Sequence, residues 1–436
     1  MIVFWVLAGV LGLGSILIGM GDKKHEKTVD EFFICGSDLK LSSLLLTILA
    51  TQLGGGSVIG SAEAAYEGGW IAIFYSFGIA LGLVLMAFTA GPALRKFGAM
   101  TISQVMGDIY KSRRLQIISS FLSIITLFLI LIAIGVSCRK VFVSLGFDAT
   151  WMLIGFWSVL IIYTMIGGLR AVVVTDKLQV IFILAVFLLI GGFLWEELLF
   201  AMQSSATVGN VTSQISWSGW ILMPLCFMVI SQDMGQRCFA AKSDRDIRRA
   251  MIGGSALLVV ATMVPVFVGI LGRYLGLNLG DESVFMAVVK ATLPPAVISF
   301  VAIAVLMVII STADSLLCAI SSNVALDFMQ SKSMKQSQWV TFIIGVLSLV
   351  LSFYEGDVIP VMIVGYEVSV FGLLIPFSMG LWLKNVTERQ GLWSLSMGLI
   401  GFFCTKIWDF SGMELVVLIL PILPYIKTIR ERSRGR

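Results

Sequence analysis

The sequence predicts an all-α polytopic membrane protein in which about thirteen helices cross the bilayer. The first observation is composition, because 58% of the residues are hydrophobic and 13% are charged, whereas soluble globular proteins carry about 25% charged residues. The second is length, because about thirteen apolar stretches approach the roughly 20 residues that one crossing requires. The third is the concentration of lysine and arginine in alternate loops, which is typical of membrane proteins.

The expected spans follow one another with no soluble domain between them, so residues 1–436 are expected to form one membrane domain. The first span, 2–20, lacks the basic n-region and the cleavage site of a signal peptide, and is therefore an extra N-terminal helix. Core helices are expected over about 41–383 and two C-terminal helices over about 390–427. The spans are 2–20, 41–65, 68–92, 115–142, 149–167, 171–199, 216–235, 250–276, 294–322, 337–354, 357–383, 390–410 and 412–427.

The basic residues predict the orientation. With the N-terminus outside, most of the 30 lysines and arginines fall in cytoplasmic loops, and one such loop contains Arg237, Lys242 and Arg245. The positive-inside rule then places the N-terminus outside and the C-terminus in the cytoplasm, with the chain in the cell membrane. This orientation requires an odd number of crossings. The net charge of +4 comes from these loops and indicates no nucleic-acid partner, and no obligate protein partner is evident.

The sequence offers little for an enzyme or a metal centre. Six cysteines are scattered without a CxxC pair, and the one histidine, His25, lies in a charged loop. We find no nucleophile–base pair and no cofactor motif, so we expect no catalytic activity. A membrane sensor is a further alternative, and the lack of a kinase-like stretch argues against it.

The stretch 41–65 indicates a transporter. It is apolar enough to cross a bilayer, yet it carries Gln52, the run Gly54–Gly56 and Ser57 near its middle. Three consecutive glycines weaken a helix by roughly 1 kcal/mol each. Backbone groups freed by a break in a membrane helix are tolerated where they line an enclosed cavity, and transporters bind solute and ion at such breaks.

Ionisable residues inside spans are costly and are candidates for function. In the span 294–322, Ser311, Asp314 and Ser315 fall on one helix face, and such oxygens can bind a small hard cation. The alternative is that these hydroxyls hold helices together. Asp176 can be a second functional acid or an acid favoured by a helix start. The full set within spans is Glu63, Asp176, Glu196, Glu197, Asp233, Asp314 and Glu367.

Residues from about 28 to 330 resemble the sodium:solute symporter family. The motifs that carry the resemblance are TVDEFFICGSDLK, ATQLGGGSVIGSAEAAY, GGLRAVVVTDKLQ, QDMGQRCFAAKSDRDIRRA and ISTADSLLCAISS. The resemblance implies a LeuT-type core of 5+5 helices in an inverted repeat, with extra flanking helices, and Na⁺ as the coupling ion. It also implies a sodium site between the broken helix and the eighth core helix. The implied ligands are the carbonyl oxygens of Ala50, Leu53 and Val308 and the hydroxyls of Ser311 and Thr312.

Some family members have a second ion position, whose matching residues here are Asp176, Asp314 and Ser315. Two unshielded carboxylates in a low dielectric repel each other, so we expect a shared cation or proton between them. A separation of more than about 10 Å between the two carboxylates would contradict this expectation. Coupling to protons in place of sodium is the alternative.

The glycine run and the Ser-Thr-Ala-Asp-Ser spelling resemble the choline-transporter branch of the family, which implies a quaternary ammonium solute. However, Gln52 stands where that branch has an aromatic residue, which favours a solute that forms hydrogen bonds, such as an amino acid or related zwitterion. The expected function is therefore sodium-coupled import of such a small polar solute. The expected solute contacts are Gln52, Gly54, Gly55, Gly56, Ser57, Tyr75, Ser231 and Gln232.

Overall fold

The computed structural model describes residues 2–22, 28–203, 218–280, 282–353, 357–383, 385–408 and 414–434. The loop residue His25 and the ends of the predicted spans 216–235, 337–354, 390–410 and 412–427 lie outside the described residues.

The described residues are almost entirely helical, which confirms the predicted all-α class. Short π-helical or 3₁₀-helical segments, labelled η, interrupt or extend several helices. The α-helices are α1 (Ile2–Asp22), α2 (Val29–Ile34), α3 (Leu41–Gln52), α4 (Ser61–Gly68), α5 (Ile73–Phe88), α6 (Ala90–Lys96), α7 (Ile102–Tyr110), α8 (Arg113–Ser144), α9 (Ala149–Phe193), α10 (Trp195–Gln203), α11 (Met223–Ile230), α12 (Gln232–Ala240), α13 (Asp244–Tyr274), α14 (Val284–Thr292), α15 (Pro295–Ser322), α16 (Met334–Leu351), α17 (Val358–Ser369), α18 (Ile375–Trp382), α19 (Glu388–Trp408), α20 (Glu414–Ile419) and α21 (Ile426–Arg434).

Several of these helices are long and apolar enough to cross a membrane. Seven helices of the described chain meet this test singly, and the number rises to 8 when the bent pair Leu41–Gln52 and Gly56–Gly68 counts as one span. The protein is thus a multi-pass membrane protein, while the count of thirteen crossings stays a prediction.

The helix α9 has a kink where the sequence predicts a boundary between two spans. It runs for 45 residues, and the backbone at Gly168 leaves helical geometry with φ of 50° and ψ of −152°. The positive φ favours glycine. Because one crossing needs about 20 residues, the two parts of α9 are together long enough for two crossings.

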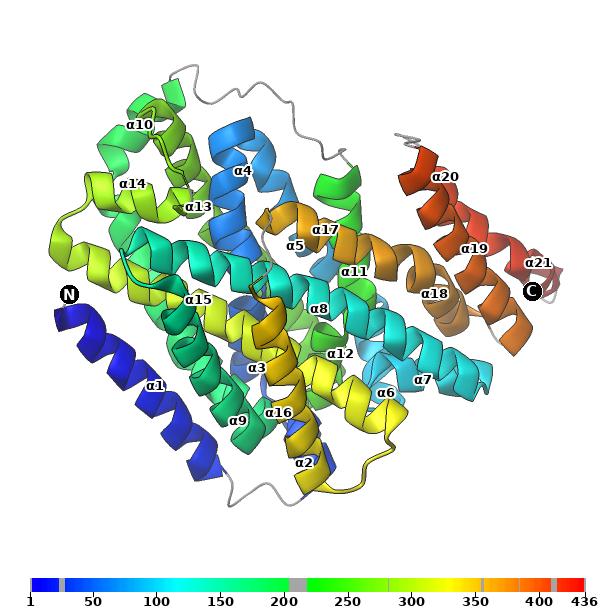
Figure 1. Cartoon of the computed structure of the whole chain (residues 1–436). Coiled ribbons are helices and arrows are strands. Elements are labelled where there is room, and N and C mark those ends of the chain that lie inside the picture. The colour runs from blue at the N-terminus through cyan, green and yellow to red at the C-terminus, as the bar shows by residue number, and fades with distance from the viewer. Residues whose placement is uncertain are drawn as a thin grey trace.

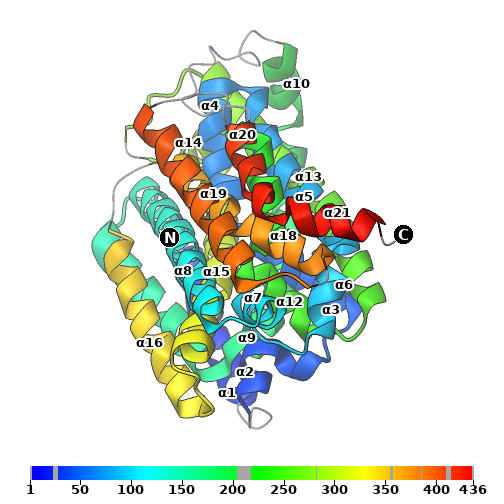
Figure 2. The same cartoon turned by 90° about the vertical axis from the view of Figure 1, so that its right-hand side faces the viewer.

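The broken helix lies at the centre of the molecule, and other helices surround it (Figure 1). α3 contacts α9, α13 and α15, while α4 contacts α13 and α14. α1 packs on the outside against α9 and α15, and α19, α20 and α21 lie at the opposite edge (Figures 1 and 2). The core therefore sits around the break between α3 and α4.

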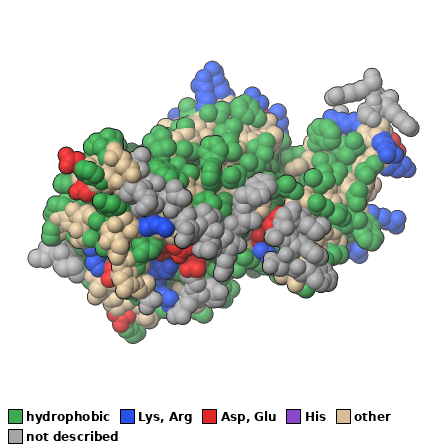
Figure 3. Space-filling view, turned by 90° about the horizontal axis from the view of Figure 1, so that it is seen from above, with side chains coloured by type: hydrophobic (Ala, Val, Ile, Leu, Met, Phe, Trp, Pro, Cys, Tyr) green, Lys and Arg blue, Asp and Glu red, His purple; other side chains and the backbone are tan. Residues whose placement is uncertain are grey.

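The outer surface is apolar, as expected of a protein surrounded by lipid. Large hydrophobic side chains are well exposed on α1 and α9, with Leu13 67% and Leu188 79% accessible. In a view from above the molecule as drawn in Figure 1, hydrophobic side chains cover much of the visible surface, and charged side chains form small groups (Figure 3). An extended apolar surface of this kind is typical of helices that contact lipid.

Candidate functional site

The helix expected to break does so at the glycine run. α3 ends at Gln52, and helical geometry resumes at Gly56 in the π-helical segment η2 (Gly56–Gly60), which leads into α4. The two halves are bent by 55° relative to each other. The prediction of an interrupted helix within 41–65 is confirmed.

Two glycines of the run are required by close packing. A Cβ atom at Gly54 would lie against the side chain of Thr312, and one at Gly56 would lie against Met362 and Tyr75. Neither position can take a larger residue without displacing these neighbours.

Hydroxyl and carbonyl oxygens converge where α3 ends against α15. Ser311 Oγ lies 3.1 Å from the carbonyl oxygen of Ala50 and 3.0 Å from that of Val308. Thr312 Oγ1 lies 2.9 Å from the carbonyl oxygen of Thr51 and 3.3 Å from that of Val308. All of these residues are buried. We call Ala50, Thr51, Val308, Ser311 and Thr312 the oxygen cluster.

The oxygen cluster has the chemistry of a small hard cation site. Such cations prefer oxygen ligands, and both hydroxyls can turn their protons away and present lone pairs instead. Leu53, the remaining residue of the expected set, directly follows α3 with a non-helical φ of −78° and ψ of 56°. The structure thus brings Ala50, Val308, Ser311 and Thr312 together, with Leu53 at the break beside them.

A second polar cluster lies next to the oxygen cluster, joined to it where Thr51 Oγ1 lies 3.0 Å from Ser315 Oγ. The Arg237 guanidinium lies 3.7 Å from Asp176 Oδ2 and donates a hydrogen bond of 2.7 Å to Ser315 Oγ. Ser315 Oγ in turn lies 3.4 Å from Asp314 Oδ1. These three consecutive contacts place the two carboxylates within the limit of about 10 Å set above. All four side chains are fully buried, and we call Asp176, Arg237, Asp314 and Ser315 the charge cluster.

Hydroxyl groups surround the charge cluster. Thr47 donates a hydrogen bond of 2.5 Å to Asp176 Oδ2, and the Tyr163 hydroxyl donates to Asp314 Oδ2. Asp176 Oδ1 has no hydrogen-bond partner among the described residues. With both acids ionised, the cluster contains two negative charges and one positive charge. One more monovalent cation would make it neutral.

The position of Arg237 corrects one interpretation of the sequence. The charge pattern placed Arg237 in a cytoplasmic loop with Lys242 and Arg245, but the structure buries it completely in α12. The reason is that its partners Asp176 and Ser315 come from other helices and compensate the charge inside the protein. Arg237 thus places a positive charge beside Asp176 inside the protein.

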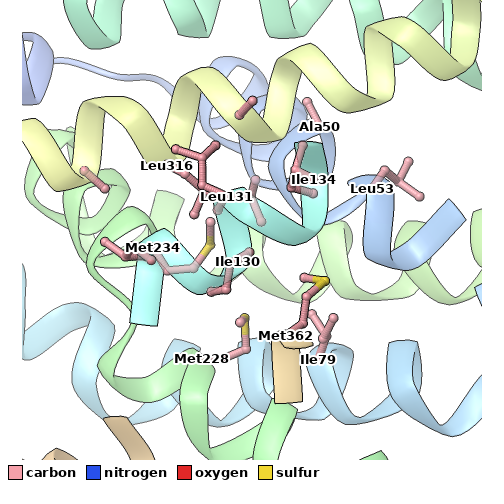
Figure 4. Packing of buried hydrophobic residues seen from close by; sticks show 14 of the residues in the cluster. Ala50, Leu53, Ile79, Ile130, Leu131, Ile134, Met228, Met234, Leu316 and Met362 are labelled. Carbon is pink, nitrogen blue, oxygen red and sulfur yellow. The ribbon is translucent and has the colours of Figure 1, made fainter. Parts of the chain in front are cut away.

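A small cavity of ≈ 30 Å³ opens at the break, beside the oxygen cluster. A space of this size holds about two water molecules. Five of the expected solute contacts line it, namely Gln52, Gly54, Gly56, Ser57 and Tyr75. Its apolar lining comes from α5, α8, α11, α15 and α17 (Figure 4), and includes Ile79, Ile130, Met228, Leu316 and Met362.

The other three expected contacts do not line this cavity. A Cβ at Gly55 would point to α8, 2.8 Å from Ser137 Oγ. The Gln232 side chain accepts a hydrogen bond of 2.8 Å from the backbone N–H of Ile102, and it contacts Ser322 at 3.2 Å. The Ser231 hydroxyl donates a hydrogen bond to the Asp233 carboxylate. The Gln232 side chain instead connects α12 with α7 and α15.

Sequence reasoning did not predict several residues that line the cavity, among them Phe227, Asp233 and Tyr366. Asp233 had a signal, because it is one of the few acids within a predicted span. The aromatic residues had none, because phenylalanine and tyrosine are common in apolar helices. Two other acids within spans form ion pairs, Glu63 with Lys140 at 3.0 Å and Glu367 with Lys406 at 2.6 Å.

Comparisons with known proteins agree with these features. The model of the sodium:solute symporter family matches residues 32–398. The sodium/pantothenate symporter of Haemophilus influenzae is 26% identical over 85% of this chain and 79% of its own length. The osmoregulated proline transporter of Bacillus subtilis is 23% identical over 95% of this chain and 90% of its own. A solved Na⁺-coupled sialic acid symporter, substrate-bound and outward-open, matches with a TM-score of 0.80 at 17% identity, over 97% of this chain and 96% of that one, so the fold is shared.

Proposed function

The chain belongs to the sodium:solute symporter family, and from this premise we propose that it imports a small amino acid or related zwitterion together with sodium. Family membership makes sodium the coupling ion and solute symport the activity. The solute class and the site residues are our proposal, supported by the geometry of the break.

The single observation that carries the proposal is the shared wall of the oxygen cluster and the cavity. Thr312 and Thr51 contribute oxygens to the cluster, and both also line the cavity. We assign sodium to Ala50, Leu53, Val308, Ser311 and Thr312. Sodium there holds α3 against α15 and so fixes the wall that the solute contacts. Binding of the ion and of the solute is then reciprocally coupled.

The solute is assigned to the cavity at the break, where Gln52 and Ser57 supply polar groups and Tyr75 an aromatic wall. The first turn of the helical segment after the break offers backbone N–H groups and a partial positive charge, which favour a carboxylate. The carboxylate of a zwitterion can bind to these N–H groups. Because the cavity holds about two waters in this conformation, solute entry requires its lining side chains to move.

We further propose that the fold comprises thirteen crossings with a LeuT-type 5+5 inverted repeat, in one domain over 1–436. The N-terminus is then outside and the C-terminus in the cytoplasm. Alternating access follows when the helices around the break rock between an outward-open and an inward-open arrangement.

A second cation is assigned to the charge cluster, at Asp176, Asp314 and Ser315. The support is its charge balance and the free Oδ1 atom of Asp176. The alternative is that a proton, and not a second sodium ion, binds to one of these two acids. The sodium dependence and the pH dependence of uptake distinguish the two.

Sodium is expected to stabilise the purified protein against heat where equimolar potassium does not. A ligand at about one hundred times its dissociation constant adds about 2.7 kcal/mol. Ser311→Ala or Thr312→Ala removes a ligand oxygen and should lower the midpoint shift caused by sodium. Ser321→Ala is the matched control, because its hydroxyl lies on the same helix but bonds to the carbonyl of Leu317. Equal shifts in sodium and potassium, or an unchanged shift in both site variants, would refute the assignment.

Asp176→Asn is expected to reduce the number of coupled cations by one. Solute uptake into proteoliposomes, measured against sodium concentration, should lose its cooperativity, while Ser311-dependent stabilisation by sodium remains. If the second cation is a proton, the variant should instead lose the pH dependence of uptake at unchanged sodium cooperativity. Glu63→Gln is the control, since Glu63 pairs with Lys140 outside the charge cluster. A variant with wild-type sodium and pH dependence would return Asp176 to a structural role.

A further inference from the structure

Asp233 places a carboxylate in the wall of the solute cavity. Among the described residues that line the cavity, it is the one acid, and it is 4% exposed. It lies just after Ser231, where the helix is interrupted between α11 and α12 with ψ of 123°. The Ser231 hydroxyl donates to Asp233 Oδ1, and the first turn of α12 favours a negative charge.

The nearby arginine does not neutralise Asp233. Within the described chain, Arg237 forms its ion pair with Asp176. Arg237 also donates a hydrogen bond of 2.9 Å to the backbone carbonyl oxygen of Asp233, and not to its carboxylate. A buried carboxylate without a cationic partner is energetically unfavourable. A positively charged group in the cavity would remove this cost.

The aromatic side chains of the same wall suit a positively charged group. The Tyr366 ring stacks on Phe227 with centroids 4.5 Å apart and planes at 22°, and it faces Tyr75 at 6.4 Å and 14°. The hydroxyls of Tyr75 and Tyr366 lie 2.7 Å apart. Aromatic faces attract cations, more strongly where water is excluded.

We infer that Asp233 binds a positively charged nitrogen of the solute, and that it thereby selects amine-bearing solutes over neutral sugars and over anions without an amine. The positive charge of the nitrogen lies against the Asp233 carboxylate, and the nitrogen packs against the wall of Tyr366 and Phe227. This inference rests on the proposed function, because it places the solute at the same break, with the acidic end of a zwitterion at Gly54–Ser57.

Two methionines explain how so small a cavity receives a solute. Met228 and Met362 lie in its lining, and methionine changes rotamer readily and fills irregular space. Their displacement enlarges the cavity next to Asp233 without a change in the polar groups. The cavity therefore favours compact solutes.

The test is a thermal-shift panel on the purified full chain in sodium. The probes are the twenty protein amino acids, glycine betaine, choline, D-glucose, pantothenate, and the carboxylic acid that lacks the amino group of the best amino acid. We expect stabilisation by solutes with a positively charged nitrogen, and none by glucose, pantothenate or the deaminated acid. In Asp233→Asn, the affinity for the best probe should fall by at least about tenfold, while the shift caused by sodium alone remains.

Two controls separate the possible failures. Glu367→Gln removes another buried acid, which pairs with Lys406 and does not line the cavity, and should leave solute affinity unchanged. Phe227→Leu should weaken binding of the best probe. If Asp233→Asn does not fold, the wild-type panel alone still tests whether the protein prefers solutes with a positively charged nitrogen. Loss of the sodium effect in wild type would refute the proposed function. A normal sodium effect with no amine-bearing ligand, or wild-type affinity in Asp233→Asn, would overturn this inference alone.

Discussion

Replacing Arg237 by glutamine is expected to abolish sodium-driven solute uptake and to destabilise the protein by about 3–5 kcal/mol, because it leaves two buried carboxylates without their guanidinium partner. The hydrogen bond to Ser315 and the contact with Thr51 are lost as well. Unfolding by heat or denaturant in detergent, together with uptake into proteoliposomes, measures both effects.

The double variant Arg237→Gln with Asp176→Asn provides the decisive control. It removes one charge of each sign, so it should recover part of the stability that the single variant loses. Arg273→Gln is the matched arginine control, because Arg273 is only partly buried and donates to the backbone carbonyl of Glu67. If Arg237→Gln were as stable and as active as Arg273→Gln, the charge cluster would not balance its charges as described.

The second large effect is expected at the glycine run. Gly56→Leu should give a protein that inserts and folds but no longer binds solute, because the new side chain displaces Met362 and Tyr75 and fills the cavity. Gly54→Val should also lose stabilisation by sodium, because its side chain collides with Thr312. Overpacking of this kind costs about 1–3 kcal/mol in addition.

Gly191→Leu is the control for the glycine substitutions, since a Cβ at Gly191 meets nothing within 4 Å. Sodium-dependent and solute-dependent thermal shifts distinguish the variants. Wild-type solute affinity in Gly56→Leu would show that the solute binds elsewhere. Gly55 differs from its neighbours, because a side chain there faces Ser137 on α8 and not the cavity.

Local sequence signals predicted the elements that depend on local properties. The apolar stretches identified the long helices, and the run Gly54–Gly56 identified the break, because helix propensity and hydropathy act over a few residues. The boundary between the spans 149–167 and 171–199 appears in the structure as the kink at Gly168 within α9.

Long-range packing decides what the sequence could not predict. In the sequence, Arg237 resembles the basic loop residues near it. Its burial becomes favourable because Asp176 approaches it from α9. Likewise, Ser231 and Gln232 were the expected contacts on this segment, but the helix is interrupted at Ser231. The interruption redirects the first turn of α12, so that Asp233 lines the cavity and Gln232 faces α7.

Uptake into proteoliposomes tests the central claim most directly. The labelled amino acid that best stabilises the purified protein is offered under an inward sodium gradient, under an equal potassium gradient, and under a proton gradient alone. We predict accumulation only with sodium, and its loss in Ser311→Ala but not in Ser321→Ala. Equal accumulation on a potassium gradient, or on a proton gradient without sodium, would contradict sodium-coupled symport through the break between α3 and α4.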